Sequence, residues 1–378
     1  MKKMLFIIPS FQHGGTNRSF CNMIDLFDFE AHGIAIDLLT VKGMTDKTYL
    51  NEFKNRNINI LHENYGLSLA YYNGTNLFRR ILKKLINSCP DKLLQVILFL
   101  SCLKYNNKYC SVVSMEEGVS TRVTSYIKSP KKIAWLRCMY DRYFELTHHK
   151  DESGVYDKID KIVCVSEECQ KSLLTIYPQY KDKTLCIPNT QNRELILKKS
   201  EQAADIDFEN DIFNIVSVGR LDEVKQFHLI PEIVKKLLEQ NLKLKWYIIG
   251  DGYYQKEIAE AIKKHKVEDT VLLVGSKSNP YPLMSKADLI AVTSVSESFC
   301  NVITEGKILN RQIISTAFPA VFNTMGSYSK GIICSIDDFA KKIYDLYNSP
   351  FEYSDVLITK NKDDKDITDF VQRLEKVF

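Results

Sequence analysis

Two glutamates, Glu297 and Glu305, stand eight positions apart where a predicted strand gives way to a predicted helix. The strand covers 288–292, a polar turn follows it at 293–296, and an apolar helix covers 301–309. A carboxylate in such a loop lies at the carboxyl end of a parallel strand, where open α/β sheets bind ligands. A second carboxylate one turn into the helix can face the same crevice. Both acids are therefore candidates for binding the hydroxyl groups of a ligand.

The start of this helix, which lies between the two glutamates, offers backbone N–H groups to an anion. Its first amides have no acceptor within the helix, and the helix dipole favours negative charge there. One carboxylate for sugar hydroxyls, amides for phosphate and a second carboxylate for ribose would together fit a nucleotide sugar. Because two glutamates at this spacing are common by chance, the flanking segments must decide. The donor-contacting residues predicted in this loop are Ser298, Phe299, Cys300, Asn301 and Val302.

Two cations lie upstream in another predicted strand-to-helix loop. Residues 214–221 have the pattern of a buried strand that ends in a glycine and Arg220, and Lys225 follows five residues after that arginine. Arginine can donate forked hydrogen bonds to a diphosphate, and lysine adds a point charge. Two more apolar runs follow, at 244–252 and 270–275, and both end in glycine.

The order and intervals of these segments across 212–316 resemble the donor-binding half of the retaining GT-B glycosyltransferases of family 4, the glycosyl transferases group 1. The family's pattern is a V-G-R-L strand end, K-G four residues on, a strand ending G-x-G, a strand ending F/V-x-G, and then E-x7-E. This chain departs from it at Gln226, Ser298 and Cys300, where the family commonly has glycine. Every charged position of the pattern is occupied.

The resemblance implies a retaining hexosyl- or glycosyltransferase whose donor is a nucleotide diphosphate sugar, with UDP-sugars favoured. Arg220, Lys225 and the amides at 300–302 would stabilise charge on the leaving diphosphate. Glu297 would hold the donor sugar and Glu305 would bind ribose hydroxyls. The residues assigned to catalysis are Glu297, Arg220 and Lys225, and no protein nucleophile is assigned. This fixed positive charge makes a metal unnecessary, no D-x-D motif suited to one is found, and no cofactor is expected.

The resemblance also assigns backbone roles to glycines. Gly275 and Ser276 would line the pocket for the base. Gly14 and Gly15 follow the first predicted strand, ahead of a helix, where glycine lets the backbone approach a ligand and the helix start favours an anion. In the family, this Gly-Gly loop lies near the donor phosphates and the acceptor.

Three charged residues of the first half are candidates for binding the acceptor. Glu116 and Glu117 open a predicted helix, where the dipole alone would favour acids, so a purely structural role stays open. Arg137 stands where many relatives have a histidine that helps to hold the donor sugar. The histidine's role therefore does not carry over, although a cation near the sugar or phosphates remains an option.

Predicted strands and helices alternate along the chain, which implies parallel sheets with helices on both faces. We predict an α/β fold of the GT-B type, with two Rossmann-like, doubly wound domains that face a cleft. The first, acceptor-binding domain covers 1–190 and, by the resemblance, is completed by a C-terminal helix at 365–378. A polar linker at 191–211 joins it to the nucleotide-sugar-binding domain at 212–364.

Composition describes an ordinary soluble chain. Its 378 residues suit two domains, and a net charge of +4 is too small to indicate a nucleic-acid partner. The ten cysteines show no C-x2-C spacing, so they are expected to be reduced thiols of a cytoplasmic protein. Lys2 and Lys3 precede an apolar run that breaks at Pro9, which indicates a first strand and not a signal peptide.

Residues 77–105 are apolar and basic, a composition typical of helices that lie on anionic membranes. The alternative is that both helices pack on the first sheet with their lysines in water. The apolar part at 93–100 is too short to span a bilayer. Since relatives often use lipid-carried acceptors, weak, salt-sensitive contact with the inner face of the plasma membrane stays open beside that alternative. The basic residues concerned are Arg79, Arg80, Lys83 and Lys84.

The predicted acceptor is a glycan or a lipid-linked glycan in bacterial surface polysaccharide synthesis, such as that of capsule or lipopolysaccharide. Two alternatives remain: a nucleotide-sugar epimerase of the same architecture, and a non-catalytic partner that keeps the fold. The first would need acid–base residues that we do not identify, and the second would be expected to lose charged site residues. A nicotinamide dehydrogenase is disfavoured because 249–252 lacks the third glycine of G-x-G-x-x-G.

Overall fold

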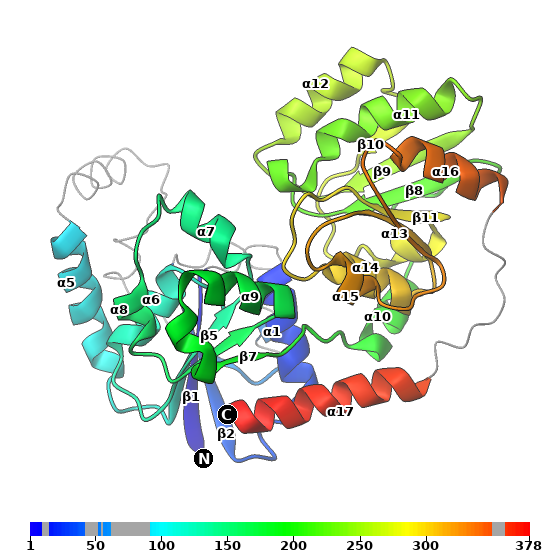
Figure 1. Cartoon of the computed structure of the whole chain (residues 1–378). Helices are drawn as coiled ribbons and strands as arrows, with labels where there is room; N and C mark the ends of the chain where they lie inside the picture. Colours follow the sequence, from blue (N-terminus) through cyan, green and yellow to red (C-terminus); the bar gives the residue numbers. More distant parts are fainter. Residues whose placement is uncertain (10–14, 42–51, 54–55, 62–90, 350–359) are drawn as a thin grey trace. The chain divides into compact units, whose positions relative to one another are not determined.

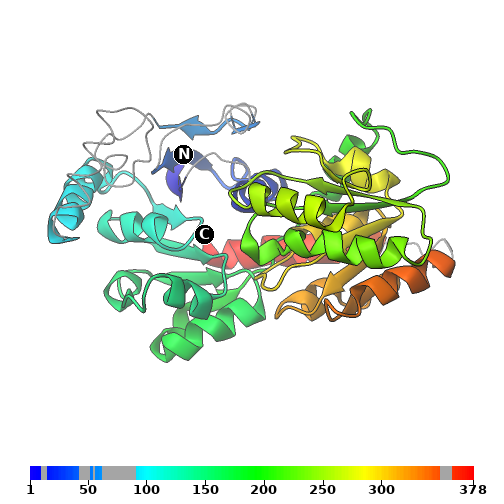
Figure 2. The same cartoon turned by 90° about the horizontal axis from the view of Figure 1, so that it is seen from above.

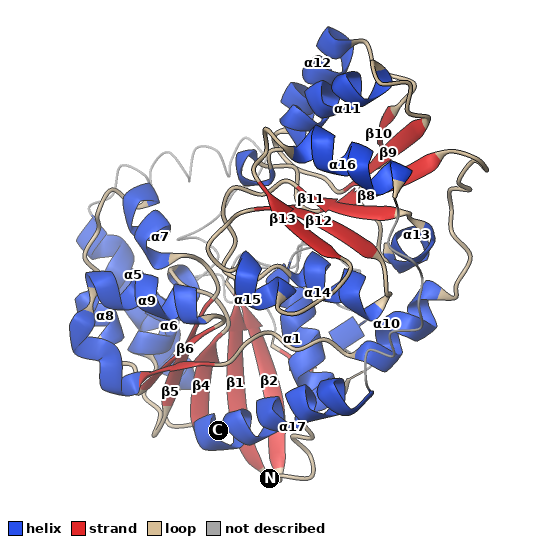
Figure 3. Cartoon of the chain, turned by 45° about the vertical axis from the view of Figure 1, so that its right-hand side comes forward, coloured by secondary structure: helices blue, strands red, loops and turns tan. Residues whose placement is uncertain are grey.

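The computed structural model describes residues 1–9, 15–41, 52–53, 56–61, 91–349 and 360–378 (Figure 1). The chain forms two compact units. The first contains Met1–Thr190 together with Asp366–Phe378, and the second contains Gln191–Lys365. Each unit is built on one parallel sheet with helices packed on it (Figure 3).

Among the described residues, the sheet of the first unit has seven strands in the order β3-β2-β1-β4-β5-β6-β7, all parallel. The strands are β1 (Lys2–Ile8), β2 (Ile34–Thr40), β3 (Asn59–Ile60), β4 (Ser111–Ser114), β5 (Lys132–Leu136), β6 (Lys161–Cys164) and β7 (Thr184–Cys186). The helices are α1 (Gly15–Leu26), α5 (Asp91–Cys102), η1 (Leu103–Tyr105), α6 (Val119–Tyr126), α7 (Tyr140–Leu146), α8 (Ser153–Tyr156), α9 (Glu167–Ile176) and η2 (Pro178–Lys183). The strand order reverses between β1 and β4, which is where doubly wound sheets bind ligands.

The described sheet of the second unit has six parallel strands in the order β10-β9-β8-β11-β12-β13 and reverses between β8 and β11. The strands are β8 (Phe213–Val218), β9 (Leu244–Ile249), β10 (Val271–Leu273), β11 (Leu289–Val292), β12 (Gln312–Thr316) and β13 (Gly331–Cys334). The helices are α10 (Arg193–Ser200), η3 (Glu223–Lys225), η4 (Phe227–Leu229), α11 (Ile230–Leu238), α12 (Gln255–His265), α13 (Tyr281–Lys286), α14 (Asn301–Ile308), α15 (Val321–Met325) and α16 (Phe339–Asn348).

Alternation along the buried strands builds a core on each face of the second sheet. Ile215 of β8 packs in the cluster that contains α11, α12 and α16, whereas Val216 packs in the cluster that contains α10, α13, α14 and α15. Helices α11 and α12 lie side by side (Figure 2). The apolar stripe of α11 is buried at helical spacing and consists of Ile230, Ile233, Val234 and Leu237.

The C-terminal helix α17 (Lys360–Val377) ends within the first unit. Phe370, Leu374 and Val377 are buried, and Nη1 of Arg373 donates a hydrogen bond to the Cys186 carbonyl at 3.0 Å. The ring of Phe378 contacts four aromatic rings at centroid distances of 5.4 to 6.1 Å, those of Phe6, Phe27, Phe29 and Trp135. The last residues of the chain therefore complete the core of the first unit.

Residues 191–211, for which the sequence predicts a linker, fold with the second unit and contain α10. Asn192 caps this helix, because its Oδ1 accepts a hydrogen bond from the Leu195 amide at 3.0 Å. Ile196 is buried in the core that also contains residues of α13. The polar composition hides this helix, since α10 buries little apolar surface.

No helix in the described ranges is long and apolar enough to cross a membrane. The nine cysteines of those ranges are free thiols.

Candidate active site

Two loops meet where the strand order of the second sheet reverses. One follows β8 and carries Arg220 and Lys225, and the other follows β11 and carries Glu297. Since β8 and β11 are parallel neighbours, their carboxyl ends share one edge of the sheet. Nζ of Lys225 lies 2.6 Å from Oε1 of Glu297 and forms an ion pair with it. The structure thus joins two of the residues that the sequence assigns to catalysis.

Both loops hold Lys225 in place. Buried Asp222 accepts a hydrogen bond from the Lys225 amide at 3.2 Å, and the Thr293 hydroxyl donates to the Lys225 carbonyl at 2.6 Å. A Cβ atom at Gly219 would lie 3.1 Å from Cε of Lys225, so this glycine makes room for the lysine stem. Gln226 has a φ of 51°, in the left-handed region that favours the glycine of the resembling family.

Arg220 extends into solvent from the same loop. Its side chain is 73% exposed, and its Nε donates to Oδ2 of Asp222 at 2.7 Å. Its two terminal nitrogens donate to no residue in the described part of the chain. Asp222 therefore orients the guanidinium and leaves its two terminal nitrogens, Nη1 and Nη2, exposed, which suits recognition of a phosphate.

Glu297 is largely buried, with 13% of its side chain exposed. Its Oε1 accepts a second hydrogen bond, from the Ser294 hydroxyl at 2.7 Å. Oε2 accepts none from the residues that the structure describes. Burial opposes the charged form of Lys225, but the Glu297 carboxylate outweighs this effect, and the pKa of the lysine is raised above its ordinary 10.5. Lys225 is therefore charged at neutral pH.

The helix α14 begins at Asn301, directly after this loop. The amides of Asn301 and Val302 lie in its first turn, where N–H groups lack intrahelical acceptors. Cys300 precedes the helix and is fully buried, and burial raises the pKa of its thiol, so the side chain brings no charge to the site. Ser298 and Phe299, which the sequence also assigns to the donor, are partly exposed.

Glu305 lies on α14, one turn beyond Asn301, and is 7% exposed. The Tyr281 hydroxyl donates to its Oε1 at 3.3 Å. A Cβ atom at Gly306 would lie 2.9 Å from Cδ1 of Ile290, so the glycine lets α14 approach the sheet closely.

Backbone hydrogen bonds of glycines link the carboxyl ends of β8, β9 and β10. The Gly219 amide donates to the Ile249 carbonyl, and the Gly250 amide donates to the Gly275 carbonyl, both at 3.0 Å. A Cβ atom at Gly250 would lie 1.8 Å from the Gly219 carbonyl oxygen, so no other residue fits without a backbone shift. Around Gly275, whose φ is 73°, a Cβ atom would meet nothing within 4 Å. Gly275 and Ser276, predicted to line the base pocket, follow β10 at this same edge.

The predicted residues of the first unit follow β1 and β4, the strands at its own reversal point, and the neighbouring β5. Gly15 begins α1 after β1, whereas Gly14 lies outside the described residues. Glu116 and Glu117 follow β4. The Arg137 amide, after β5, donates to Oε2 of Glu117 at 2.9 Å.

Arg137 braces the loop that carries these acids. Its Nε donates to the Met115 carbonyl at 2.7 Å, and its Nη1 donates to Oδ1 of Asn189 at 2.9 Å. Burial lowers the pKa of Arg137 to about 10, against the opposing effect of Glu116 and Glu117. The guanidinium is therefore still charged at neutral pH.

Sequence reasoning misses the polar residues that hold the charged ones. Ser294 could have been noticed, because a hydroxyl three residues before a loop carboxylate can reach it across a tight turn. Asp222 likewise stands three residues before Lys225 and caps η3. No local signal indicates Tyr281, which is 24 residues from Glu305.

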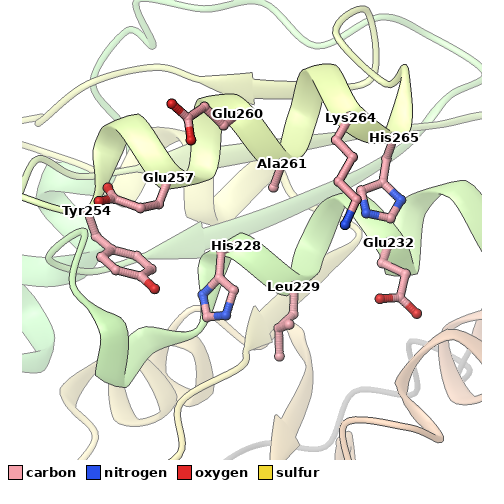
Figure 4. A pocket seen from close by; sticks show the side chains of 9 residues that line it. All are labelled: His228, Leu229, Glu232, Tyr254, Glu257, Glu260, Ala261, Lys264 and His265. Atoms are coloured by element: carbon pink, nitrogen blue, oxygen red, sulfur yellow. The ribbon is translucent and has the colours of Figure 1, made fainter.

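A separate hollow of about 460 Å³ opens between η4, α11 and α12 (Figure 4). The rings of His228 and Tyr254 meet edge to face with their centroids 5.3 Å apart, and burial lowers the pKa of His228. The Tyr254 amide donates to the Leu221 carbonyl at 3.0 Å. No residue predicted to bind a donor lines this hollow. Its lining is His228, Leu229, Glu232, Tyr254, Glu257, Glu260, Ala261, Lys264 and His265.

Within the described ranges, no three or more histidine, cysteine or acidic side chains gather in a way that could hold a metal ion.

Comparisons first define the class of fold. The whole chain matches a crystal structure of Anabaena HepE in complex with UDP and glucose, with a TM-score of 0.74 and 15% identity, over 100% of this chain and 99% of that one. Two Rossmann-like units with parallel sheets therefore form a GT-B fold, which confirms the predicted fold class.

The second unit can be assigned further. Residues 198–364 match the profile of the family Glycosyl transferases group 1, and they form a domain of that type. An uncharacterized glycosyltransferase of Methanocaldococcus jannaschii is 22% identical over 80% of this chain and 73% of its own length. The N-acetylgalactosamine-N,N'-diacetylbacillosaminyl-diphospho-undecaprenol 4-alpha-N-acetylgalactosaminyltransferase of Campylobacter jejuni is 36% identical over 27% of each chain. These matches support glycosyltransferase activity of the group 1 type.

Proposed function

We propose that this protein is a retaining glycosyltransferase of family 4 that moves a sugar from a nucleotide diphosphate sugar to a glycan or lipid-linked glycan. The observation that carries the proposal is the pairing of Lys225 with Glu297 beside the open fork of Arg220, at the ligand-binding edge of a group 1 domain. UDP-sugars are favoured because the HepE structure holds UDP and glucose. The name of the Campylobacter relative, which specifies a diphospho-undecaprenol, supports a lipid-linked acceptor. With such an acceptor, the proposed role is in the synthesis of bacterial surface polysaccharides such as capsule or lipopolysaccharide.

The leaving diphosphate is stabilised by fixed positive charge. Arg220 offers its exposed fork, Lys225 offers an ammonium group, and the amides of Asn301 and Val302 add helix-start donors. Preorganised donors of this kind are among the largest contributions to catalysis. They take the part that a divalent cation plays elsewhere, so the reaction needs neither metal nor cofactor.

The remaining residues hold the donor. Glu297 presents Oε2 to the hydroxyls of the transferred sugar, and Glu305 accepts hydrogen bonds from ribose. Gly275 and Ser276 bind the base through backbone groups. No protein nucleophile is assigned.

The acceptor contacts the first unit. Glu116 and Glu117 orient its hydroxyl groups, and Arg137 fixes their loop through bonds to the Met115 carbonyl and the Glu117 side chain. Backbone donors from Gly14 and Gly15 complete the proposed site, and of these two Gly15 begins α1.

A panel of nucleotide sugars tests the proposal by thermal shift. A ligand at a hundred times its Kd stabilises a protein by about 2.7 kcal/mol, which is readily detected. NMR of the product with the stabilising donor should then show retained anomeric configuration. If no nucleotide sugar stabilises the protein or is consumed, the proposal is wrong.

The same NMR experiment separates the alternatives. An epimerase would convert the nucleotide sugar to its epimer without an acceptor. A non-catalytic partner would bind the donor and leave it unchanged.

We also propose peripheral contact of 77–105 with the cytoplasmic face of the plasma membrane; 77–90 lie outside the described residues. The described part exposes Val96 and three large apolar side chains that follow it after three, four and seven residues, a spacing that places all four on one helix face. Exposed Lys104 and Lys108 follow them. An apolar face beside cations suits an anionic bilayer. The exposed fractions are Val96 50%, Phe99 42%, Leu100 57% and Leu103 43%.

A further inference from the structure

Ser294 lies in the loop that follows β11 and is buried, with only 1% of its surface exposed. Its hydroxyl donates to Oε1 of Glu297 at 2.7 Å. The backbone around it is fixed by its neighbours, because the Thr293 hydroxyl donates to the Lys225 carbonyl at 2.6 Å and the Val295 amide donates to the Val224 carbonyl at 2.9 Å. Ser294 therefore meets the carboxylate from a rigid position.

Both donors to Glu297 end on the same oxygen. Lys225 lies 2.6 Å and Ser294 lies 2.7 Å from Oε1, and no donor within the described ranges reaches Oε2. A carboxylate held in this way cannot rotate without lengthening two hydrogen bonds to a charged group, which are stronger than neutral ones. The direction of Oε2 is thereby set by the protein.

A diphosphate affects the two donors differently. Negative charge next to Lys225 attracts the ammonium group and weakens its bond to Glu297. The Ser294 hydroxyl is neutral and buried, so the diphosphate does not compete for it in the same way. It would therefore remain the donor to Glu297 once the lysine turned to a diphosphate.

We propose that Ser294 is the positioning residue that keeps Glu297 directed at the donor sugar while Lys225 binds the diphosphate. This inference rests on the proposed function, because it takes the sugar and the diphosphate as the ligands of those two residues.

Ser294→Ala tests it, with Ser296→Ala as the matched control. Ser296 lies in the same loop and makes no hydrogen bond within the described part of the chain. For Ser294→Ala, we expect kcat to fall about 10- to 100-fold, which corresponds to one hydrogen bond to a charged group. The Kd of UDP should be unchanged, but the additional affinity of the UDP-sugar over UDP should be lost. Ser294→Thr, which keeps the hydroxyl, should restore both.

A double-mutant cycle distinguishes positioning from general structural support. In a Glu297→Gln background, Ser294→Ala should cause little further loss of UDP-sugar affinity, since its effect passes through the carboxylate. Equal behaviour of the two serine variants would overturn the inference alone, with the proposed function intact. So would a Ser294→Ala protein that loses UDP affinity and melting temperature together. A wild-type protein that binds no nucleotide sugar would overturn the proposed function and this inference with it.

Discussion

Replacing Lys225 with methionine removes its charge and keeps an unbranched stem beside Gly219, so packing changes little. The lysine side chain is 19% exposed and its ion pair with Glu297 spans 2.6 Å. The substitution therefore acts on the chemistry through the lost cation and on stability through the carboxylate that remains.

The chemical effect should be the larger one. Losing one preorganised donor costs roughly 2.7–4 kcal/mol of transition-state stabilisation, so kcat should fall about 100- to 1000-fold. Breaking a fully buried ion pair costs about 3–5 kcal/mol, and an exposed pair costs about 0–1 kcal/mol. Glu297 is 13% exposed and keeps its bond to Ser294, so about 2 kcal/mol is expected here. That corresponds to a fall in Tm of about 4–8 °C for a domain of this size.

Steady-state turnover at saturating donor and a thermal melt measure the two effects separately. Lys236→Met is the matched control, because Lys236 pairs with Glu232 on the surface of α11 and both side chains are 52% exposed. It should change stability by less than about 0.5 kcal/mol and leave turnover alone. If Lys225→Met turns over at a near-normal rate, the lysine does not stabilise the leaving diphosphate.

The stabilising effect should also depend on pH. The pKa of Lys225 is raised in the folded protein, so the contribution of the lysine to stability is fully present below its ordinary 10.5. It is lost as pH rises through the folded pKa. The difference in unfolding free energy between wild type and Lys225→Met should therefore be constant from pH 6 to 9, as ordinary denaturant titrations can show, and decrease only in more alkaline buffer.

Three further outcomes are expected. Chelation by EDTA should leave turnover intact, because Arg220 and Lys225 supply the charge, and a loss that Mg²⁺ or Mn²⁺ restores would contradict this. Glu305→Gln should raise the Kd of UDP about 10- to 100-fold with kcat retained, and 2′-deoxy-UDP should bind both proteins alike if the lost contact is to ribose. Glutamine substitutions at the basic residues of 77–105 should release the protein from anionic vesicles, because each cation contributes about 1 kcal/mol to the binding free energy. Salt should weaken the binding further, and the affinity for the donor should stay unchanged. A wild type that ignores such vesicles at low salt would refute membrane contact. The substituted residues are Arg79, Arg80, Lys83 and Lys84, with Lys235, Lys236, Lys263 and Lys264 as the charge-matched control set on α11 and α12.

Much of the second unit is predictable because β8, β9 and β10 are followed closely by glycines and β11 is followed by the loop that carries Glu297. The run 214–221 becomes β8 with its following turn, and 288–292 becomes β11 with Asp288 just before it. Alternating strands and helices indicate parallel sheets, but the neighbours of each strand come from the resemblance, since alternation alone fixes no order. The sequence places Lys225 and Glu297 in loops of one edge, and their direct contact, across 72 residues, emerges only from the packing of β8 beside β11.

The parts that were not predictable depend on contacts that leave no periodic signal. The helix in 191–211 is such a case, because its polar composition resembles a linker, and Ile196 is its only buried residue among those described. The phenol that reaches Glu305 comes from α13, and its tyrosine looks like any other core aromatic in the sequence. Side chains that orient the charged residues are thus harder to find than the charged residues themselves.

The candidate active site pairs its own charges, and this limits how a donor can bind. A lysine that is 19% exposed would be costly without a counter-ion, and Glu297 provides one. A diphosphate that approaches Lys225 therefore has to share the ammonium group with a carboxylate already 2.6 Å away. The proposed donor supplies the compensation, because its sugar hydroxyls donate hydrogen bonds to Glu297 as its phosphates accept them from Lys225. UDP lacks the hydroxyls of the transferred sugar, so the UDP-sugar should bind more tightly than UDP. In calorimetric titrations, Glu297→Gln should abolish this difference in affinity.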